Sequence, residues 1–364
     1  MCACVSVSVC LCMLVASQMI VHSGWIRDPL RHCRPRTAKT WSQSGVFEHD
    51  VEPMKSPNLT TLQYFIIKGI SDVPKFQVPI FLLVFLIYLT TLGGNMTILI
   101  LVWKNNHLHT PMYFFLANLS ILDMSSSTIT LHRTLTNFIM GDKSISVCSC
   151  LIQMYFFSSL TSDELLILTA MSYDRYVAIC NPLHYHAVMN HRVCAVLAMA
   201  CWVWGFLQVT PVVISLFQYK CYRSNVINHF FCDVMPLVKL LCGDISFLEL
   251  FVFILGVLLA TFPFFLTFVP YLFIITSVLK IRSSAGRHKA FYTCSSHITV
   301  IVLLYGTLVC QYLRPNSNLD SNKLFSLFNT AAVPMLNPLI YSLKNKDVKF
   351  ALKRIFTRLP FTHT

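Results

Sequence analysis

An aspartate and an arginine stand together at the end of a long apolar run, where their charges could act as a pair. Asp174 and Arg175 follow an uncharged stretch, residues 165–173. Ionised groups at the end of an apolar helix are costly unless they pair or carry out a function. Such a pair can hold itself closed, or the arginine can turn inward when neighbouring helices separate. The alternative is an arginine that extends to water and only marks the boundary of the apolar segment.

Reactive side chains elsewhere do not form the pattern of an enzyme. No nucleophile lies at a sequence spacing from a base that is typical of a catalytic site. His184 and His186 are a pair in a loop and do not form a site. Metal ligands likewise do not recur at the spacings of known metal sites. We therefore expect neither an enzyme nor a cofactor.

The composition indicates that membrane helices position the charged pair. Hydrophobic residues make up 55% of the 364, charged residues make up 12%, and the mean hydropathy is +0.62. A helix needs roughly 20 apolar residues to cross a bilayer. Runs of that length cover residues 78–102, 111–130, 147–173, 193–217, 245–279, 290–312 and 324–343. A membrane barrel would show short alternating segments instead, so we expect an all-α membrane protein with a seven-transmembrane helix bundle.

The basic residues set the expected orientation. The connections on the side that carries Arg175 and the C-terminal tail hold more Lys and Arg than those on the other side. The positive-inside rule places that side in the cytoplasm, so the N-terminus is expected outside the cell. The net charge of +13 is divided among short loops, which favours contacts with anionic lipid and an acidic cytosolic partner over nucleic-acid binding.

Helical geometry predicts which side chains share the face of Arg175. Each residue of a helix turns by about 100°, so Glu164, Phe157 and Thr161 point within about 40° of Arg175. Asp163 points elsewhere, toward a neighbouring helix. Asp123 is alone in its span and is expected to face inward.

Ordered motifs in every span resemble olfactory receptors of the tetrapod type, which are rhodopsin-like G-protein-coupled receptors. The string from Met171 to Cys180 resembles the signature of their third helix. The other motifs are Gly94-Asn95, Leu108 to Leu116, Trp202, Tyr271, Lys289 to His297, and Pro334 to Tyr341. Together they cover residues 54 to about 356 in the family's order.

The resemblance implies a ligand, a partner and roles for particular residues. The ligand would be a small volatile odorant, and the partner a heterotrimeric G protein of the stimulatory type at the plasma membrane. The implied switch comprises Asp174, Arg175, Tyr176, Tyr271, His297, Asn337, Pro338 and Tyr341. The implied polar residues of mid-bundle are Asn95, Asp123 and Glu164. The two carboxyls either share a proton, cation or water, or form separate hydrogen bonds.

The expected ligand site lies between the outer halves of the helices. Its candidate residues are Phe157, Ser158, Thr161, Ser162, Tyr305, Leu308, Val309, Tyr312 and Thr330. The third-helix part of this wall has no carboxylate above Glu164, which favours a neutral apolar volatile over an amine. A receptor of the same fold for an endogenous metabolite outside the olfactory epithelium is the alternative. A transporter would need more polar or broken segments in mid-membrane.

The resemblance also implies two disulfides, Cys150–Cys232 and Cys221–Cys242, on the outer side, where disulfides persist. Cys148 could compete with Cys150, and a metal site that combines His229 with these thiols is the rival interpretation. Asn58 lies in a glycosylation sequon before the first span.

Four regions are expected along the chain. Residues 1–53 form a disordered N-terminal extension, and residues 54–77 an extracellular segment. Residues 78–343 form the bundle, and residues 344–364 a cytoplasmic tail. In the tail, Val348, Leu352 and Phe356 alternate with Lys349 and Lys353. This spacing predicts a short amphipathic C-terminal helix on the membrane surface.

Overall fold

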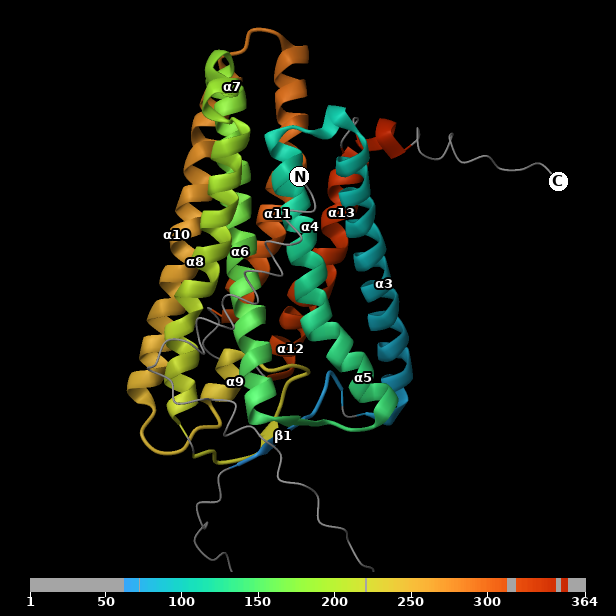
Figure 1. The fold of residues 1–364 in the computed structure, drawn as a ribbon, viewed down its shortest axis with the longest axis vertical. Coiled ribbons are helices and arrows are strands. Elements are labelled where there is room, and N and C mark those ends of the chain that lie inside the picture. Colours follow the sequence, from blue (N-terminus) through green and yellow to red (C-terminus); the bar gives the residue numbers. More distant parts are fainter. Residues whose placement is uncertain (1–61, 72, 220, 313–318, 345–347, 353–364) are drawn as a thin grey trace, which may run out of the picture. The chain divides into compact units, whose positions relative to one another are not determined.

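The computed structural model describes residues 62–71, 73–219, 221–312, 319–344 and 348–352, and seven long helical segments run through them (Figure 1). The extension 1–53 and the sequon at Asn58 lie outside these residues. The single helices are α3 (Pro74–Lys104), α6 (Val147–Cys180), α8 (His191–Gln218), α10 (Ser246–Leu279) and α11 (Ser284–Tyr312). The other two segments each combine three elements. The first consists of α4 (Pro111–Ser127), η2 (Thr128–His132) and α5 (Arg133–Met140). The second consists of α12 (Leu319–Leu327), η4 (Phe328–Ala332) and α13 (Val333–Lys344).

Length and composition make these segments membrane helices. Among the described residues, six have a window apolar enough to span a bilayer. The seventh, α6, has 34 residues and contains Asp163, Glu164, Asp174 and Arg175. Only 11% of the apolar window of α3 and 17% of that of α10 is buried, which leaves the remaining apolar side chains for lipid. The prediction of a seven-helix membrane bundle is confirmed.

Helix α6 is the central element of the bundle. It packs against α4 on one side and against α8 and α10 on the other, and Figure 1 shows it between them. Hydrogen bonds fix α10 to α6, since the Ser172 hydroxyl donates to the Thr267 carbonyl (2.7 Å) and the Thr169 and Thr267 hydroxyls lie 2.8 Å apart. Because α6 is held on several sides, side chains along its inner face have fixed positions.

The Gly94-Asn95 motif joins the first helix to the last. A Cβ atom at Gly94 would lie 2.9 Å from the ring of Pro338, so the absence of a side chain allows α3 and α13 to approach closely. The adjacent Asn95 amide donates to the Pro334 carbonyl (3.0 Å). That carbonyl would otherwise accept from residue 338, and a proline there has no N–H.

A small sheet closes one end of the bundle. Strand β1 (Tyr64–Ile67) pairs antiparallel with β2 (Ser144–Ser146) and parallel with β3 (Val226–Ile227). Phe65 and Ile67 are buried beneath it in a second apolar core. Short elements complete the connections: η1 (Asn106–Leu108), η3 (Pro182–His184), α7 (Tyr185–Val188) and α9 (Val234–Val238). The sequence analysis did not predict this sheet.

Residues 348–352 are helical beyond α13. Val348 and Ala351 are buried against the main core, whereas Lys349 and Phe350 are exposed. This part of the tail has one packed face, as an amphipathic helix requires. The predicted continuation through Lys353 and Phe356 lies outside the described residues.

Candidate functional site

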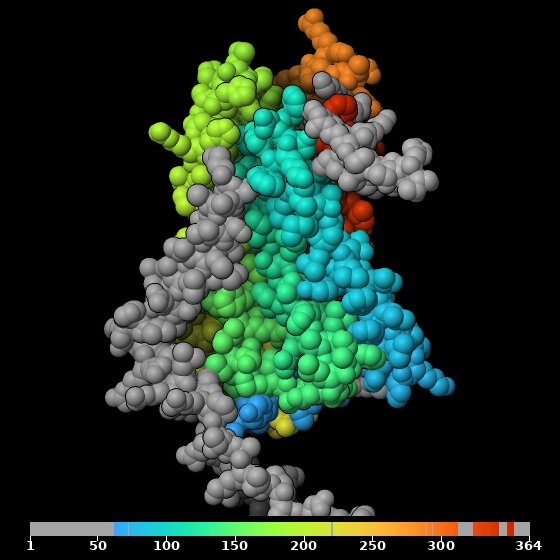
Figure 2. Space-filling view, turned by 45° about the vertical axis from the view of Figure 1, so that its right-hand side comes forward, coloured from blue at the N-terminus to red at the C-terminus, as the bar shows by residue number. Residues whose placement is uncertain are grey.

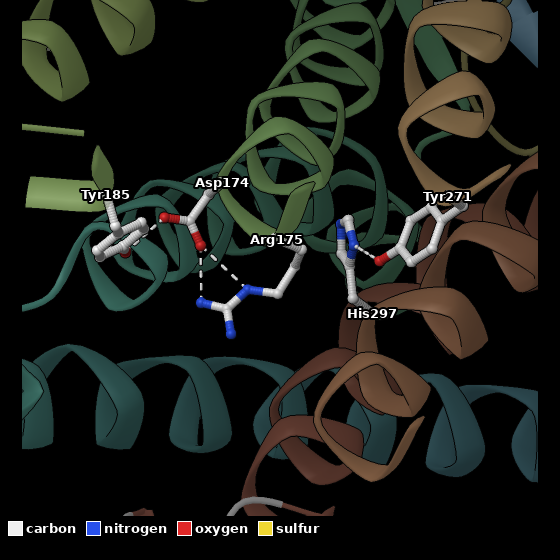
Figure 3. A network of polar contacts seen from close by, with 5 residues as sticks. All are labelled: Asp174, Arg175, Tyr185, Tyr271 and His297. Atoms are coloured by element: carbon white, nitrogen blue, oxygen red, sulfur yellow. Dashed lines mark hydrogen bonds and ion pairs between the residues drawn. The ribbon is translucent and has the colours of Figure 1, made fainter. Parts of the chain in front are cut away.

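At the end of the bundle opposite the sheet, the Asp174–Arg175 pair is closed (Figure 3). Two guanidinium nitrogens of Arg175 donate to Asp174 Oδ2, at 2.7 and 3.0 Å. The hydroxyl of Tyr185, from α7, donates to Asp174 Oδ1 at 2.8 Å. Asp174 is fully buried and Arg175 is 14% exposed. Burial and the neighbouring carboxylate raise the pKa of Tyr185, so its hydroxyl keeps its proton and remains a donor.

Three of the other predicted switch residues, Tyr271, His297 and Tyr341, are buried in the bundle. The Tyr271 hydroxyl lies 2.5 Å from His297 Nδ1, linking α10 to α11. Figure 3 shows the Arg175 guanidinium turned toward Asp174 and away from this second pair. Tyr341 is buried, and its hydroxyl has no hydrogen-bond partner among the described residues. Tyr176 is half-buried, with its ring 5.9 Å from that of Phe273 on α10.

Three polar side chains meet in the middle of the bundle. The Asn337 amide donates to both carboxylate oxygens of Asp123, at 3.0 Å each. Glu164 is buried next to Asn337 and Asp123, and its Oε1 atom has no hydrogen-bond partner in the described part of the chain. The structure therefore brings together α4, α6 and α13 at two of the three expected mid-bundle residues, Asp123 and Glu164, with Asn337 from the predicted switch. The third, Asn95, binds the Pro334 carbonyl instead.

Asp163 lies beside Glu164 in sequence but faces a different helix. It is fully buried, and its carboxylate packs against Gly205 of α8, in the place that a larger side chain at this position would occupy. Neither carboxylate oxygen has a hydrogen-bond partner within the described residues. The two adjacent acids thus belong to separate interfaces, as helical geometry requires.

The predicted ligand residues fall into two aromatic groups. Phe157 on α6 packs edge-on against Phe231, with ring centres 4.7 Å apart. Tyr305 on α11 packs edge-on against Phe264 and Phe268 of α10, at 5.3 and 6.2 Å. The Tyr305 hydroxyl has no hydrogen-bond partner among the described residues.

The remaining candidates differ in their exposure. Ser162, Leu308 and Thr330 are buried, whereas Ser158 and Thr161 are half-buried. Val309 is 50% exposed on α11 and is not part of either aromatic group. Its contact with ligand stays a prediction. For Tyr312 the structure describes the backbone but not the side chain.

A loop segment, residues 229–233, packs against Phe157 through Phe230 and Phe231, and its contribution was not predicted from the sequence. Cys232 forms a disulfide with Cys150 (Cα–Cα 5.5 Å), and its backbone N–H donates to Gln153 Oε1 (3.1 Å). The Gln311 amide of α11 donates to Asp233 at 3.4 Å. Gln153 and Gln311 are polar residues within apolar spans, a signal that could have located these contacts.

His229 begins this loop segment. Its Nε2 atom lies 3.2 Å from the Ser326 hydroxyl of α12. Burial, and then the positive charge of Lys323, lower the pKa of His229 to about 4, so the imidazole is neutral at physiological pH. The second predicted disulfide joins Cys221 and Cys242. Because these cysteines and the Cys150–Cys232 pair are oxidised, they offer no thiolates for the rival metal site.

Comparison with known proteins agrees with this architecture. A family model for the olfactory receptor matches residues 84–359. Mouse olfactory receptor 5G9 is 45% identical over 303 residues, which are 83% of this chain and 96% of that protein. Human olfactory receptor 6C1 is 43% identical over 296 residues, which are 81% of this chain and 95% of that protein.

Seven membrane helices with an Asp-Arg pair at the end of the third define the rhodopsin-like class of G-protein-coupled receptors. Within that class, the chain belongs to the olfactory receptor family. It is accordingly a multi-pass protein of the plasma membrane.

Proposed function

We propose that this odorant receptor binds a small, neutral, mostly apolar volatile between α6, α10, α11 and α12. The observation that carries the proposal is the Tyr305 hydroxyl, which lies in an aromatic setting without a hydrogen bond from the described residues. A buried polar group without a partner costs roughly 1–3 kcal/mol. A ligand carbonyl or hydroxyl can make that missing hydrogen bond, while its hydrocarbon part contacts Phe264 and Phe268.

The polarity of the α6 wall supports a neutral ligand. Asp163 faces α8 and Glu164 lies with Asn337 in mid-bundle, so neither carboxylate points toward Phe157. The Asp233 carboxylate of the loop segment 229–233 accepts from Gln311. The ammonium group of an amine ligand would therefore lose its hydration in this site without forming an ion pair with one of these carboxylates, which makes its binding unfavourable.

We further propose that the end with the disulfides and the sheet faces outward and that the Asp174–Arg175 end faces the cytoplasm. A bound odorant then favours a state in which Arg175 leaves Asp174 and turns toward Tyr271 and Tyr341. The cavity that opens receives a stimulatory-type G protein, and cyclic AMP rises. The charge asymmetry of the loops and the closed ion pair support this assignment.

A screen of volatiles in cells that report cyclic AMP tests the proposal, with water-soluble metabolites as the second arm. For an agonist with one oxygen-containing group, Tyr305→Phe should raise the half-maximal concentration about three- to tenfold, since a hydrogen bond contributes about 0.5–1.5 kcal/mol. The matched control Val302→Ala changes an exposed side chain of the same helix that is not a candidate ligand residue, and it should leave that concentration unchanged. Equal responses of Tyr305→Phe and the unmodified receptor would refute this ligand site. A response to metabolites alone would favour the alternative receptor.

A further inference from the structure

A cavity lies outside the proposed odorant site, where the first two membrane segments meet the sheet. It has a volume of about 350 Å³. Its walls come from α3, from α5 and from the chain that follows β1. Figure 2 shows α3, in blue, and the green segment that contains α5 side by side on this face. None of its described lining residues belongs to α6, α10 or α11, so it lies apart from the aromatic group around Tyr305. Phe230 forms part of its wall and packs with Phe231 beside Phe157, so this ring stands between the cavity and the Phe157 group.

The inner part of this cavity is apolar. Ile80, Phe81 and Val84 line it from α3, and Leu135 and Phe138 line it from α5. The rings of Phe81 and Phe138 stack with their centres 4.6 Å apart. Phe138 is 39% exposed. A hydrocarbon chain is the ligand part that matches such an apolar lining.

The rim of the same cavity is cationic. Among its described lining residues, the charged ones are Lys68 and Lys143. Lys143 is exposed and donates one hydrogen bond, to the Lys68 carbonyl at 3.4 Å. An ammonium group has three donors, so Lys143 can still bind an anion. The neighbouring Asp142 carboxylate accepts from the Ser144 backbone N–H (2.8 Å) and is not part of the lining.

We propose that this cavity binds a medium-chain fatty-acid anion, with the chain between α3 and α5 and the carboxylate at Lys143. If each chain carbon takes about 30 Å³, the volume of a water molecule in the liquid, 350 Å³ holds up to about twelve carbons. Decanoate, whose chain is slightly shorter, fits within that volume. The proposal does not depend on which odorant the receptor detects, because the two sites use different helices.

Photolabelling of the full-length receptor in nanodiscs of zwitterionic lipid tests the proposal. The probe is decanoate with a diazirine near the end of its chain, and mass spectrometry locates the label. We expect label on α3 and α5, near Phe81 and Phe138, and competition by decanoate at least tenfold stronger than by decanol. Decyltrimethylammonium, which has the same chain and a positive head, should not compete. Label confined to α6, α10 and α11 would place the chain in the odorant site and overturn the proposal. Equal competition by decanol would overturn the requirement for an anion.

Variants separate the roles of the rim and of the cavity. Lys143→Glu should weaken labelling at least fivefold, while Lys239→Glu, an exposed lysine at the same end but outside the lining, should not. Asn137→Trp places a large ring in the cavity from half-buried α5 and should abolish labelling. Unchanged thermal unfolding without probe shows that each variant is folded. Full labelling of folded Lys143→Glu or Asn137→Trp would refute the proposed site.

Discussion

From the closed Asp174–Arg175 pair we predict how much the substitution Asp174→Asn raises basal signalling. In Asp174→Asn the side chain keeps its size but loses its charge and one of its two acceptor oxygens. The three hydrogen bonds that the carboxylate accepts, two from Arg175 and one from Tyr185, cannot all remain. Hydrogen bonds to charged groups contribute about 1.5–3 kcal/mol each. If one is lost from the closed state alone, the equilibrium shifts toward the open state about 10- to 100-fold.

The assay is basal cyclic AMP, normalised to receptor at the cell surface, together with the response to an identified agonist. Asp174→Asn should raise the basal level about tenfold, up to the ceiling set by the fully active receptor, because Arg175 is released but still present. Arg175→Ala releases the same lock and removes the group that would meet Tyr271 and Tyr341. It should therefore abolish signalling at a normal surface level.

The two opposite outcomes distinguish a switch from a boundary marker. Asp142→Asn is the matched control, since Asp142 is exposed at the other end of the bundle and accepts from the Ser144 backbone. Its basal level should not change. A basal level in Asp174→Asn equal to that of the unmodified receptor, at equal surface density, would refute the proposed lock. Normal agonist response of Arg175→Ala would show that the arginine only marks the membrane boundary.

Two further predictions concern stability. The pKa of His229 is lowered from 6.5 to about 4 in the folded protein. Between these pH values the unfolded chain binds a proton that the folded chain does not, so the stability falls as the pH falls. From pH 7.5 to pH 5 the loss is about 2 kcal/mol. In His229→Gln the free energy of unfolding should lose about 2 kcal/mol of its dependence on pH between these values. The melting temperature measured at both pH values reports this change, and an unchanged difference between them would contradict the explanation. A Cβ at Gly205 would overlap the Asp163 carboxylate and lie 3.1 Å from the Ser159 carbonyl, so Gly205→Ala should cost about 1–3 kcal/mol and lower the amount at the surface. Gly256→Ala, where no atom lies within 4 Å, should match the unmodified receptor.

Helical periodicity was sufficient to orient the side chains of α6. A turn of about 100° per residue placed Phe157 and Glu164 on one inner face and Asp163 on another, and the structure agrees. Such predictions succeed because a regular helix fixes each side-chain direction relative to the others, whatever the rest of the chain does. The family's motifs directed attention to Asp123 and Glu164 in mid-bundle, whereas the contact of Asp123 with Asn337 was not predicted.

The ligand-site residues of α11 were chosen by family position, without the use of periodicity. Along α11 the buried side chains are Ile301, Leu304, Tyr305, Leu308 and Gln311. Their spacing of three and four residues excludes Val309 from the inner face and includes Gln311. The pairing of Gln311 with Asp233 is different, because an irregular loop has no period and its position depends on contacts remote in sequence. The π turns η2 and η4 leave no comparable pattern in the sequence.

Helix α11 is the element through which ligand and G protein could influence each other. Near its C-terminal end Gln311 binds Asp233 of the loop segment 229–233, and nearer its N-terminal end His297 binds Tyr271. Tyr305 lies between these contacts, at the proposed ligand site. A ligand can shift the receptor's equilibrium only by binding one state better than the other. A displacement of α11 alters the aromatic surroundings of Tyr305 and the His297–Tyr271 bond together, because one continuous helix carries both. Any preference of the ligand for the displaced helix is therefore matched, by linkage, in the affinity for the G protein.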